Sequence, residues 1–95
     1  MELDVKMYVR QDCDLCDAMY HEFMDWIDSR GLRVALSLDR RDIDNCEEWL
    51  QSYDRLVPVL VVNGIQVCHY FFDPDRLNLV LLENDAKRNS KANEY

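Results

Sequence analysis

The sequence has few basic residues for its length. Its 11 lysines and arginines stand against 19 aspartates and glutamates, which gives a formal net charge of -8 at pH 7. Affinity for the phosphates of nucleic acids comes mostly from lysine and arginine. The acidic excess therefore argues against a general nucleic-acid-binding protein.

Long apolar runs are also missing. No stretch approaches the roughly 20 apolar residues that a helix needs to cross a bilayer, so we expect no membrane association. The opening residues Met1–Asp4 show no basic segment followed by an apolar run, as a signal peptide would. We therefore expect a cytoplasmic protein. Thiols stay reduced in that compartment, so two structural disulfides among the four cysteines are not expected.

Repeats and internal linkers are absent from the sequence, and 95 residues fit one domain with one modest core. Residues 85–95 are polar and show no apolar periodicity. We expect the folded domain to span residues 1–84 and residues 85–95 to form a disordered C-terminal tail.

The spacing of apolar residues predicts a β-α-β-α-β-β-α series. Strand, helix and strand within forty residues form a βαβ unit, whose strands should be parallel. Asn63-Gly64 predicts a two-residue hairpin turn. The predicted elements are a strand over Leu3–Val9, a helix from Asp14 to about Arg30, a strand from Arg33 to Asp39, a short helix capped by Asp44 or Asn45, a strand over 55–62 with Pro58 near its start, a strand over Ile65–Phe71, and a helix from Pro74 to near Asn84.

Cys13 and Cys16 stand where the first strand gives way to the first helix. Unpaired backbone N–H groups and the helix dipole stabilise a thiolate at such a position. Two cysteines separated by two residues can also close a small disulfide, which is typical of a redox dithiol. The same spacing occurs in half of a zinc site and in ordinary buried cysteines, so spacing alone leaves these alternatives open.

The two cysteines differ in their expected exposure. Cys16 lies three residues before Met19 and seven before Phe23, so it leans toward the core-facing stripe of the helix. Cys13 lies one turn earlier, at the open end. This asymmetry suits an exposed attacking thiol and a covered resolving thiol. Cys46 and Cys68 are interpreted as residues without chemistry.

With Cys13-Asp14-Leu15-Cys16 at the first strand–helix junction and Val57-Pro58 before the third strand, the sequence resembles the glutaredoxin-like proteins of the thioredoxin fold. The short bacterial members are the most similar. The resemblance covers about Leu3 to Leu82. It implies an α/β three-layer sandwich with a four-stranded mixed sheet of order 2-1-3-4, two helices on one face and one on the other.

The resemblance implies a thiol–disulfide oxidoreductase, with Cys13 as nucleophile and Cys16 as resolving thiol. Pro58 would follow a cis peptide bond, and the backbone of Val57 would pair with an extended thiol substrate. Arg10 stands where many glutaredoxins carry a basic residue that meets the carboxylate of glutathione. The implied partner is a disulfide-containing protein or glutathione, which is the candidate co-substrate. We expect a monomer with no bound cofactor or metal.

The sequence departs from that family in two places. Glutaredoxins that bind glutathione have a Gly-Gly pair and an Asp after the fourth strand, where this chain has the segment 70–74, Tyr-Phe-Phe-Asp-Pro. Asp12, Asp14 and Asp17 surround the dithiol. Their carboxylates oppose both the binding of anionic glutathione and the formation of the Cys13 thiolate.

Two other functions compete with the enzyme. Cys13 and Cys16 could hold zinc together with Cys68 or His69, if the fourth strand came within reach. A non-catalytic binding module would instead use the acidic charge and two apolar residues off the stripe of the last helix, Leu79 and Leu82. We expect those two leucines to cover the sheet rather than to bind a partner.

Overall fold

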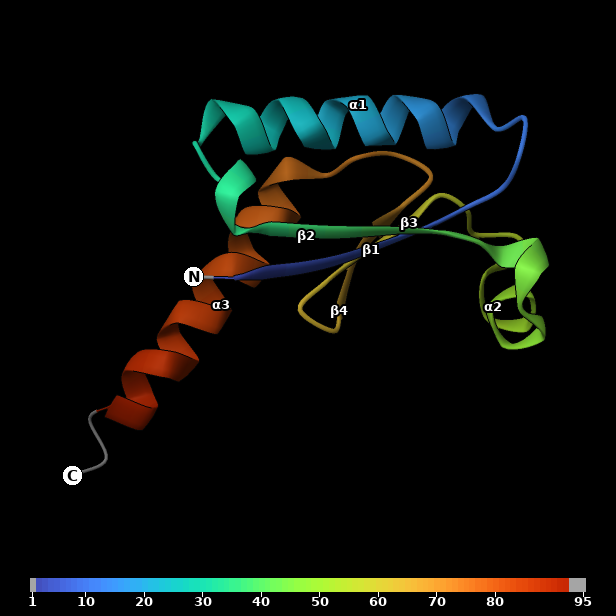
Figure 1. Ribbon diagram of the computed structural model, residues 1–95. Helices are drawn as coiled ribbons and strands as arrows, with labels where there is room; N and C mark the ends of the chain where they lie inside the picture. The colour runs from blue at the N-terminus through green and yellow to red at the C-terminus, as the bar shows by residue number, and fades with distance from the viewer. Residues whose placement is uncertain (1, 93–95) are drawn as a thin grey trace.

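The computed structural model describes residues 2–92, with the side chains of residues 2–83 (Figure 1). Its four strands form one sheet of order β2-β1-β3-β4, which confirms the predicted α/β architecture. β1 pairs in parallel with β2 and antiparallel with β3, and β3 and β4 form an antiparallel hairpin. The strands are β1 (Leu3–Val9), β2 (Leu36–Asp42), β3 (Val59–Val62) and β4 (Ile65–His69).

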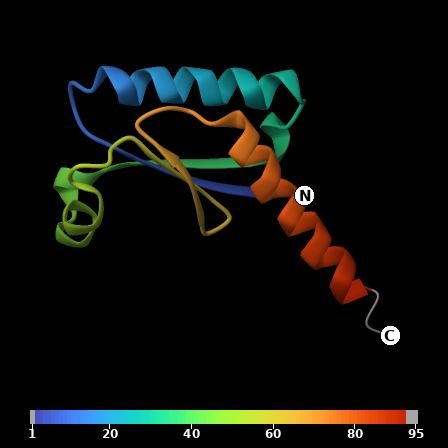
Figure 2. The same cartoon turned by 180° about the vertical axis from the view of Figure 1, so that it is seen from behind.

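Helices cover both faces of the sheet. α1 (Asp14–Ser29) and the first turns of α3 (Pro74–Ala92) pack on one face, and α2 (Glu47–Tyr53) packs on the other (Figures 1 and 2). The result is the three-layer sandwich that the sequence predicts. The N-terminus of α1 lies beyond the end of β1, and the chain from β4 to α3 passes beneath it.

The main core lies between the sheet and the pair α1 and α3. The odd-numbered residues of β1 point into it, as the alternation predicts, and Phe23 and Ile27 of α1 meet Leu77 and Val80 of α3 there. Burying one such side chain contributes about 1.5–3 kcal/mol relative to leaving it in water. This layer therefore fixes α1, and with it the cysteine pair, on the sheet.

A smaller core under α2 explains why β1 is apolar on both faces near its end. Tyr8 belongs to the even-numbered face, yet it is buried because α2 covers it. Its ring stacks on Tyr53 with centroids 4.2 Å apart and meets the edge of Trp49 at 5.9 Å. Ile43 is fully buried in the same cluster.

The bounds predicted for the second strand are wrong. Residues 33–35 form a single 3-10 turn in which Val34 is 98 % exposed, and β2 begins only at Leu36. β2 then continues to Asp42, three charged residues beyond the predicted end of the strand at Asp39. This strand lies at the edge of the sheet, where charged side chains such as the ion pair of Arg41 with Asp39 remain in water.

The second helix also begins later than predicted. Residues 43–45 form a 3-10 turn that Asp42 caps, since its carboxylate accepts the N–H of Asp44 at 2.9 Å. α2 follows with Cys46 as its N-cap, without a side-chain hydrogen bond. The strands β3 and β4 are shorter than predicted, although the hairpin turn with Gly64 at φ +81° is confirmed.

The last helix does not end near Asn84 but continues to Ala92. Most of the predicted tail is therefore helical in its backbone, and residues 93–95 lie outside the described residues. Extending a helix that is already nucleated needs little further stabilisation, and residues 85–92 contain neither proline nor glycine. The expectation for Leu79 and Leu82 is also wrong, because they are 53 % and 63 % exposed instead of covering the sheet.

Candidate functional site

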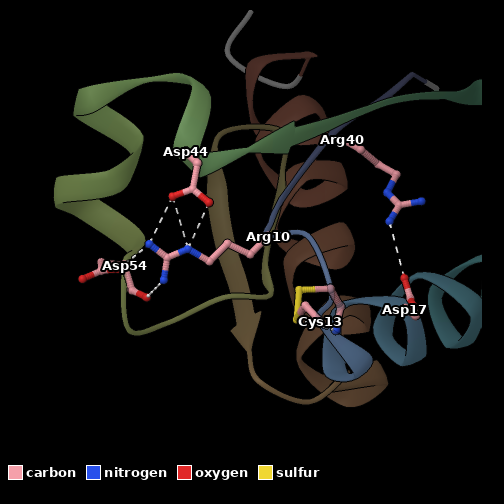
Figure 3. Close-up of a disulfide and its surroundings, with 7 residues drawn as sticks. Arg10, Cys13, Asp17, Arg40, Asp44 and Asp54 are labelled. Atoms are coloured by element: carbon pink, nitrogen blue, oxygen red, sulfur yellow. Dashed lines mark hydrogen bonds and ion pairs between the residues drawn. A yellow bond between two sulfur atoms is a disulfide. The ribbon is translucent and has the colours of Figure 1, made fainter.

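Cys13 and Cys16 form a disulfide at the start of α1, with their Cα atoms 5.2 Å apart (Figure 3). β1 ends at Val9, and a short loop brings the chain to Cys13, the N-cap of α1. The Cys13 sulfur accepts the backbone N–H of Cys16 at 3.1 Å. The unpaired N–H groups of the first helical turn thus face this sulfur, which is the arrangement that stabilises a thiolate.

The two cysteines are unequally exposed. Cys16 is 1 % exposed and belongs to the main core with Met19 and Phe23, whereas Cys13 is partly exposed at the edge of that core. A reagent in solution can therefore reach Cys13 but not Cys16. Leu15, between the two cysteines in the sequence, is exposed.

Val57 and Pro58 immediately precede β3, which begins at Val59. The bond between them is cis, and the carbonyl of Pro58 accepts the N–H of Tyr70 at 2.9 Å. Val57 packs against the same core as Cys13. Among the described residues, no backbone hydrogen bond involves Val57. Its N–H and C=O therefore have no backbone partner within that part of the chain.

Arg10 turns away from the disulfide (Figure 3). Its guanidinium forms ion pairs with Asp44 at 3.2 Å and with Asp54 at 2.7 Å. The hydrogen bond to Asp44 is the main cause that raises the pKa of Arg10. In this structure Arg10 ties the end of β1 to the segment around α2. Sequence reasoning missed both partners, because they follow Arg10 by 34 and 44 positions. No local pattern links residues that far apart in the sequence.

Three carboxylates surround the cysteine pair. Asp12 and Asp14 flank Cys13, and the N–H of Asp17 bonds to the Cys13 carbonyl at 3.1 Å. Asp17 reaches Arg40 at 3.9 Å. Asp12 and Asp14 are exposed and have no ion pair within the part of the chain whose side chains are described.

The segment from β4 to α3 borders an open groove of about 430 Å³, lined in part by Cys68, Phe71 and Asp73. Phe71 is 70 % exposed. The Asp73 carboxylate accepts the N–H of Arg76 at 3.0 Å and caps α3. Burial raises the pKa of the Cys68 thiol, so this cysteine is poorly nucleophilic at neutral pH.

The described residues hold no group of three or more His, Cys, Asp or Glu arranged to bind a metal ion. Cys68 and His69 are therefore not brought together with the cysteine pair into a zinc site. In the same part of the chain, no helix combines the length and the apolar character that crossing a bilayer requires.

Comparison with known proteins agrees with the fold. A model described as Glutaredoxin-like domain (DUF836) matches residues 4–82. No curated protein matches the chain. The solution NMR structure of protein Ne2328 from Nitrosomonas europaea has a TM-score of 0.71 and 26 % sequence identity, and the alignment covers 84 % of this chain and 92 % of that one.

Two thioredoxins are more distant. The germline-specific thioredoxin Deadhead from Drosophila melanogaster has a TM-score of 0.53 and 19 % identity, with 86 % of this chain and 80 % of that chain covered. Thioredoxin from Fasciola hepatica has a TM-score of 0.52 and 17 % identity over the same shares. At such low identity these likenesses show the fold alone, and that fold is the thioredoxin fold.

Proposed function

Because the chain belongs to the glutaredoxin-like domain family, we propose that it is a thiol–disulfide oxidoreductase whose working group is the Cys13–Cys16 dithiol. One observation carries the proposal. The pair lies at disulfide distance at a helix N-terminus, with one sulfur accessible and the other buried. Exchange chemistry needs this combination, because one thiol must meet the substrate and the second must remain close to the first.

The reaction begins from the reduced protein. The Cys13 thiolate attacks one sulfur of a substrate disulfide, a Cys13–substrate disulfide forms, and the other substrate sulfur leaves as a thiolate. Cys16 then attacks the Cys13 sulfur and expels the second half of the substrate. The substrate disulfide gains two electrons and the dithiol loses two, which gives the oxidised pair. A small dithiol, or two monothiols, must supply two electrons to restart the cycle.

Val57 and Pro58 provide the proposed substrate-binding edge. The unpaired backbone groups of Val57 are suited to an extended chain, which would add to the sheet by main-chain hydrogen bonds. Either a protein segment or glutathione could supply that chain.

Arg10 is the proposed contact for a substrate carboxylate, but its guanidinium is engaged. It could serve a carboxylate only after leaving Asp44 and Asp54. The segment after β4 also lacks the Gly-Gly pair of glutathione-binding glutaredoxins and places Tyr70 and Phe71 there. Both features favour a protein disulfide over glutathione as the substrate.

A non-catalytic binding module is the second candidate. The exposure of Leu79 and Leu82 on α3 favours it, because solvent-facing leucines on one helix are suited to a partner. This function would need neither cysteine of the pair.

Trapping of covalent adducts distinguishes the two candidates. Cys16→Ser leaves the attacking thiol but removes the internal route that resolves the mixed disulfide. This variant should accumulate adducts in cell extract that reductant releases, whereas Cys13→Ser should accumulate few. Both variants are made with Cys46→Ala and Cys68→Ala, because those free thiols could form background adducts. Absence of adducts in both, with the fold intact, would favour the binding module.

A further inference from the structure

The reacting sulfur lies in a negative environment. Asp12 and Asp14 are its covalent neighbours, and neither has an ion pair among the described side chains. Asp17 lies in the first turn of α1, where Arg40 reaches it at 3.9 Å. Charges this close to Cys13 act within the Debye length, about 8 Å at physiological ionic strength.

Among the described side chains, the positive groups near the site leave Asp12 and Asp14 without an ion pair. Arg10 is held between Asp44 and Asp54 and points away from the disulfide (Figure 3). Arg40 pairs with Asp17 and lies over the ring of Tyr20. An anionic disulfide would therefore approach Cys13 against repulsion, and a cationic disulfide would be attracted.

The entrance to β3, where Val57 packs on the same core as Cys13, has the features of a polypeptide-binding site. The backbone of Val57 is unpaired among the described residues, and Tyr70, bonded to Pro58, leads into the exposed ring of Phe71. An extended chain could pair with Val57 and rest apolar side chains on Phe71. A small disulfide without a peptide backbone, such as cystamine, would use neither feature.

This inference rests on the proposed function and names its substrate class. We propose that the dithiol selects polypeptide disulfides that carry lysine or arginine beside the reacting cysteine, and that it discriminates against anionic disulfides such as glutathione disulfide. The exchange is the one given above. The positive side chain lies against Asp12 and Asp14 while the Cys13–substrate bond forms.

The test is a single turnover of reduced protein with three peptide disulfides that differ only in the flanking residue: lysine, glutamine or glutamate. Each rate constant is divided by that of the same peptide with dithiothreitol, which removes differences in intrinsic reactivity. At low salt the lysine peptide should react at least about tenfold faster than the glutamate peptide, the lower end of reported electrostatic effects. In 1 M salt, where the Debye length is about 3 Å, the ratio should approach one.

Substitution identifies the carboxylates responsible. Asp12→Asn and Asp14→Asn should each reduce the lysine-to-glutamate ratio at least about twofold, and together they should nearly abolish it. Asp12 has φ +53°, a conformation that asparagine also tolerates, so the fold should be preserved. A change in the thiolate fraction of Cys13 alters all three rates alike and cancels in the ratio. Asp25→Asn is the matched control, because Asp25 is exposed and roughly 16 Å further along α1.

Each outcome has a distinct meaning. Equal normalised rate constants for the three peptides would overturn the proposed selection by charge. So would a lysine-to-glutamate ratio that Asp25→Asn reduces as much as Asp14→Asn does. Cystamine is a small cationic disulfide without a peptide backbone. If it reacts as fast as the lysine peptide, the proposed preference for polypeptide disulfides is wrong. The neutral 2-hydroxyethyl disulfide tests the underlying activity separately. If neither it nor any of the three peptides oxidises the Cys13–Cys16 pair, the proposed function is wrong.

Discussion

In the reduced protein, alkylation should be far faster at Cys13 than at Cys16. Cys13 is partly exposed in the native fold, so iodoacetamide can react with it directly. Cys16 is 1 % exposed and is one of six residues that α1 buries in the core. Its sulfur becomes accessible only when the first part of α1 separates from the sheet.

The free energy of that opening sets the size of the difference. Local openings cost anything up to the global free energy of unfolding, about 5–15 kcal/mol. An opening of about 3–5 kcal/mol makes Cys16 roughly 10²- to 10⁴-fold slower than an accessible thiol, since each factor of ten corresponds to about 1.4 kcal/mol.

The assay is peptide mapping by mass spectrometry over time, in a background of Cys46→Ala and Cys68→Ala. In concentrated guanidinium chloride the two cysteines should alkylate at rates within about threefold of each other, because burial is lost. Similar rates for the two in native buffer, or a faster Cys16, would refute the assignment of attacking and resolving roles.

Three further predictions concern the surroundings of the site. Phe23→Ala, which empties part of the core beneath the pair, should lower the free energy of unfolding in urea by about 3–5 kcal/mol, whereas Leu79→Ala at an exposed position should change it by no more than about 0.5 kcal/mol. Arg10→Ala should speed amide hydrogen exchange in Glu47–Tyr53, because it removes the ion pairs that hold this segment; unchanged exchange would contradict that role. Burial raises the pKa of Cys68 above its ordinary value of 9.0, so its alkylation should be slow at pH 7 and its rate should still be rising with pH at 9.0; a plateau reached below pH 8 would contradict this.

The elements at the centre of the fold could be predicted because their burial leaves a periodic pattern. β1 alternates in the sequence, and α1 begins at Asp14 as predicted. β2 is different, because its course through charged residues is set by pairing with β1 rather than by its own side chains. Val34 continues the apolar alternation of that segment, yet it lies outside the strand and is exposed. Tertiary pairing therefore overrode local pattern at this edge.

The candidate site was only partly predictable. The position of the cysteine pair and its unequal exposure follow from the place in the sequence where the strand pattern changes to the helix pattern. The partners of Arg10 could not be predicted in this way. Asp44 and Asp54 reach it only once the 3-10 turn at residues 43–45 and α2 are folded against the end of β1. Likewise, the length of α3 depends on a helix nucleated by the core, which the polar composition after Asn84 does not reveal.

The mass of the protein before and after oxidation tests the central claim most directly. Reduced protein with Cys46→Ala and Cys68→Ala is incubated with a stoichiometric amount of 2-hydroxyethyl disulfide, and its mass is measured. Reversible dithiol exchange predicts a loss of about 2 Da, the two hydrogens of the thiols, with a single disulfide mapped to Cys13 and Cys16 and reversed by dithiothreitol. An unchanged mass, or a stable adduct that never closes to the internal disulfide, would contradict the account.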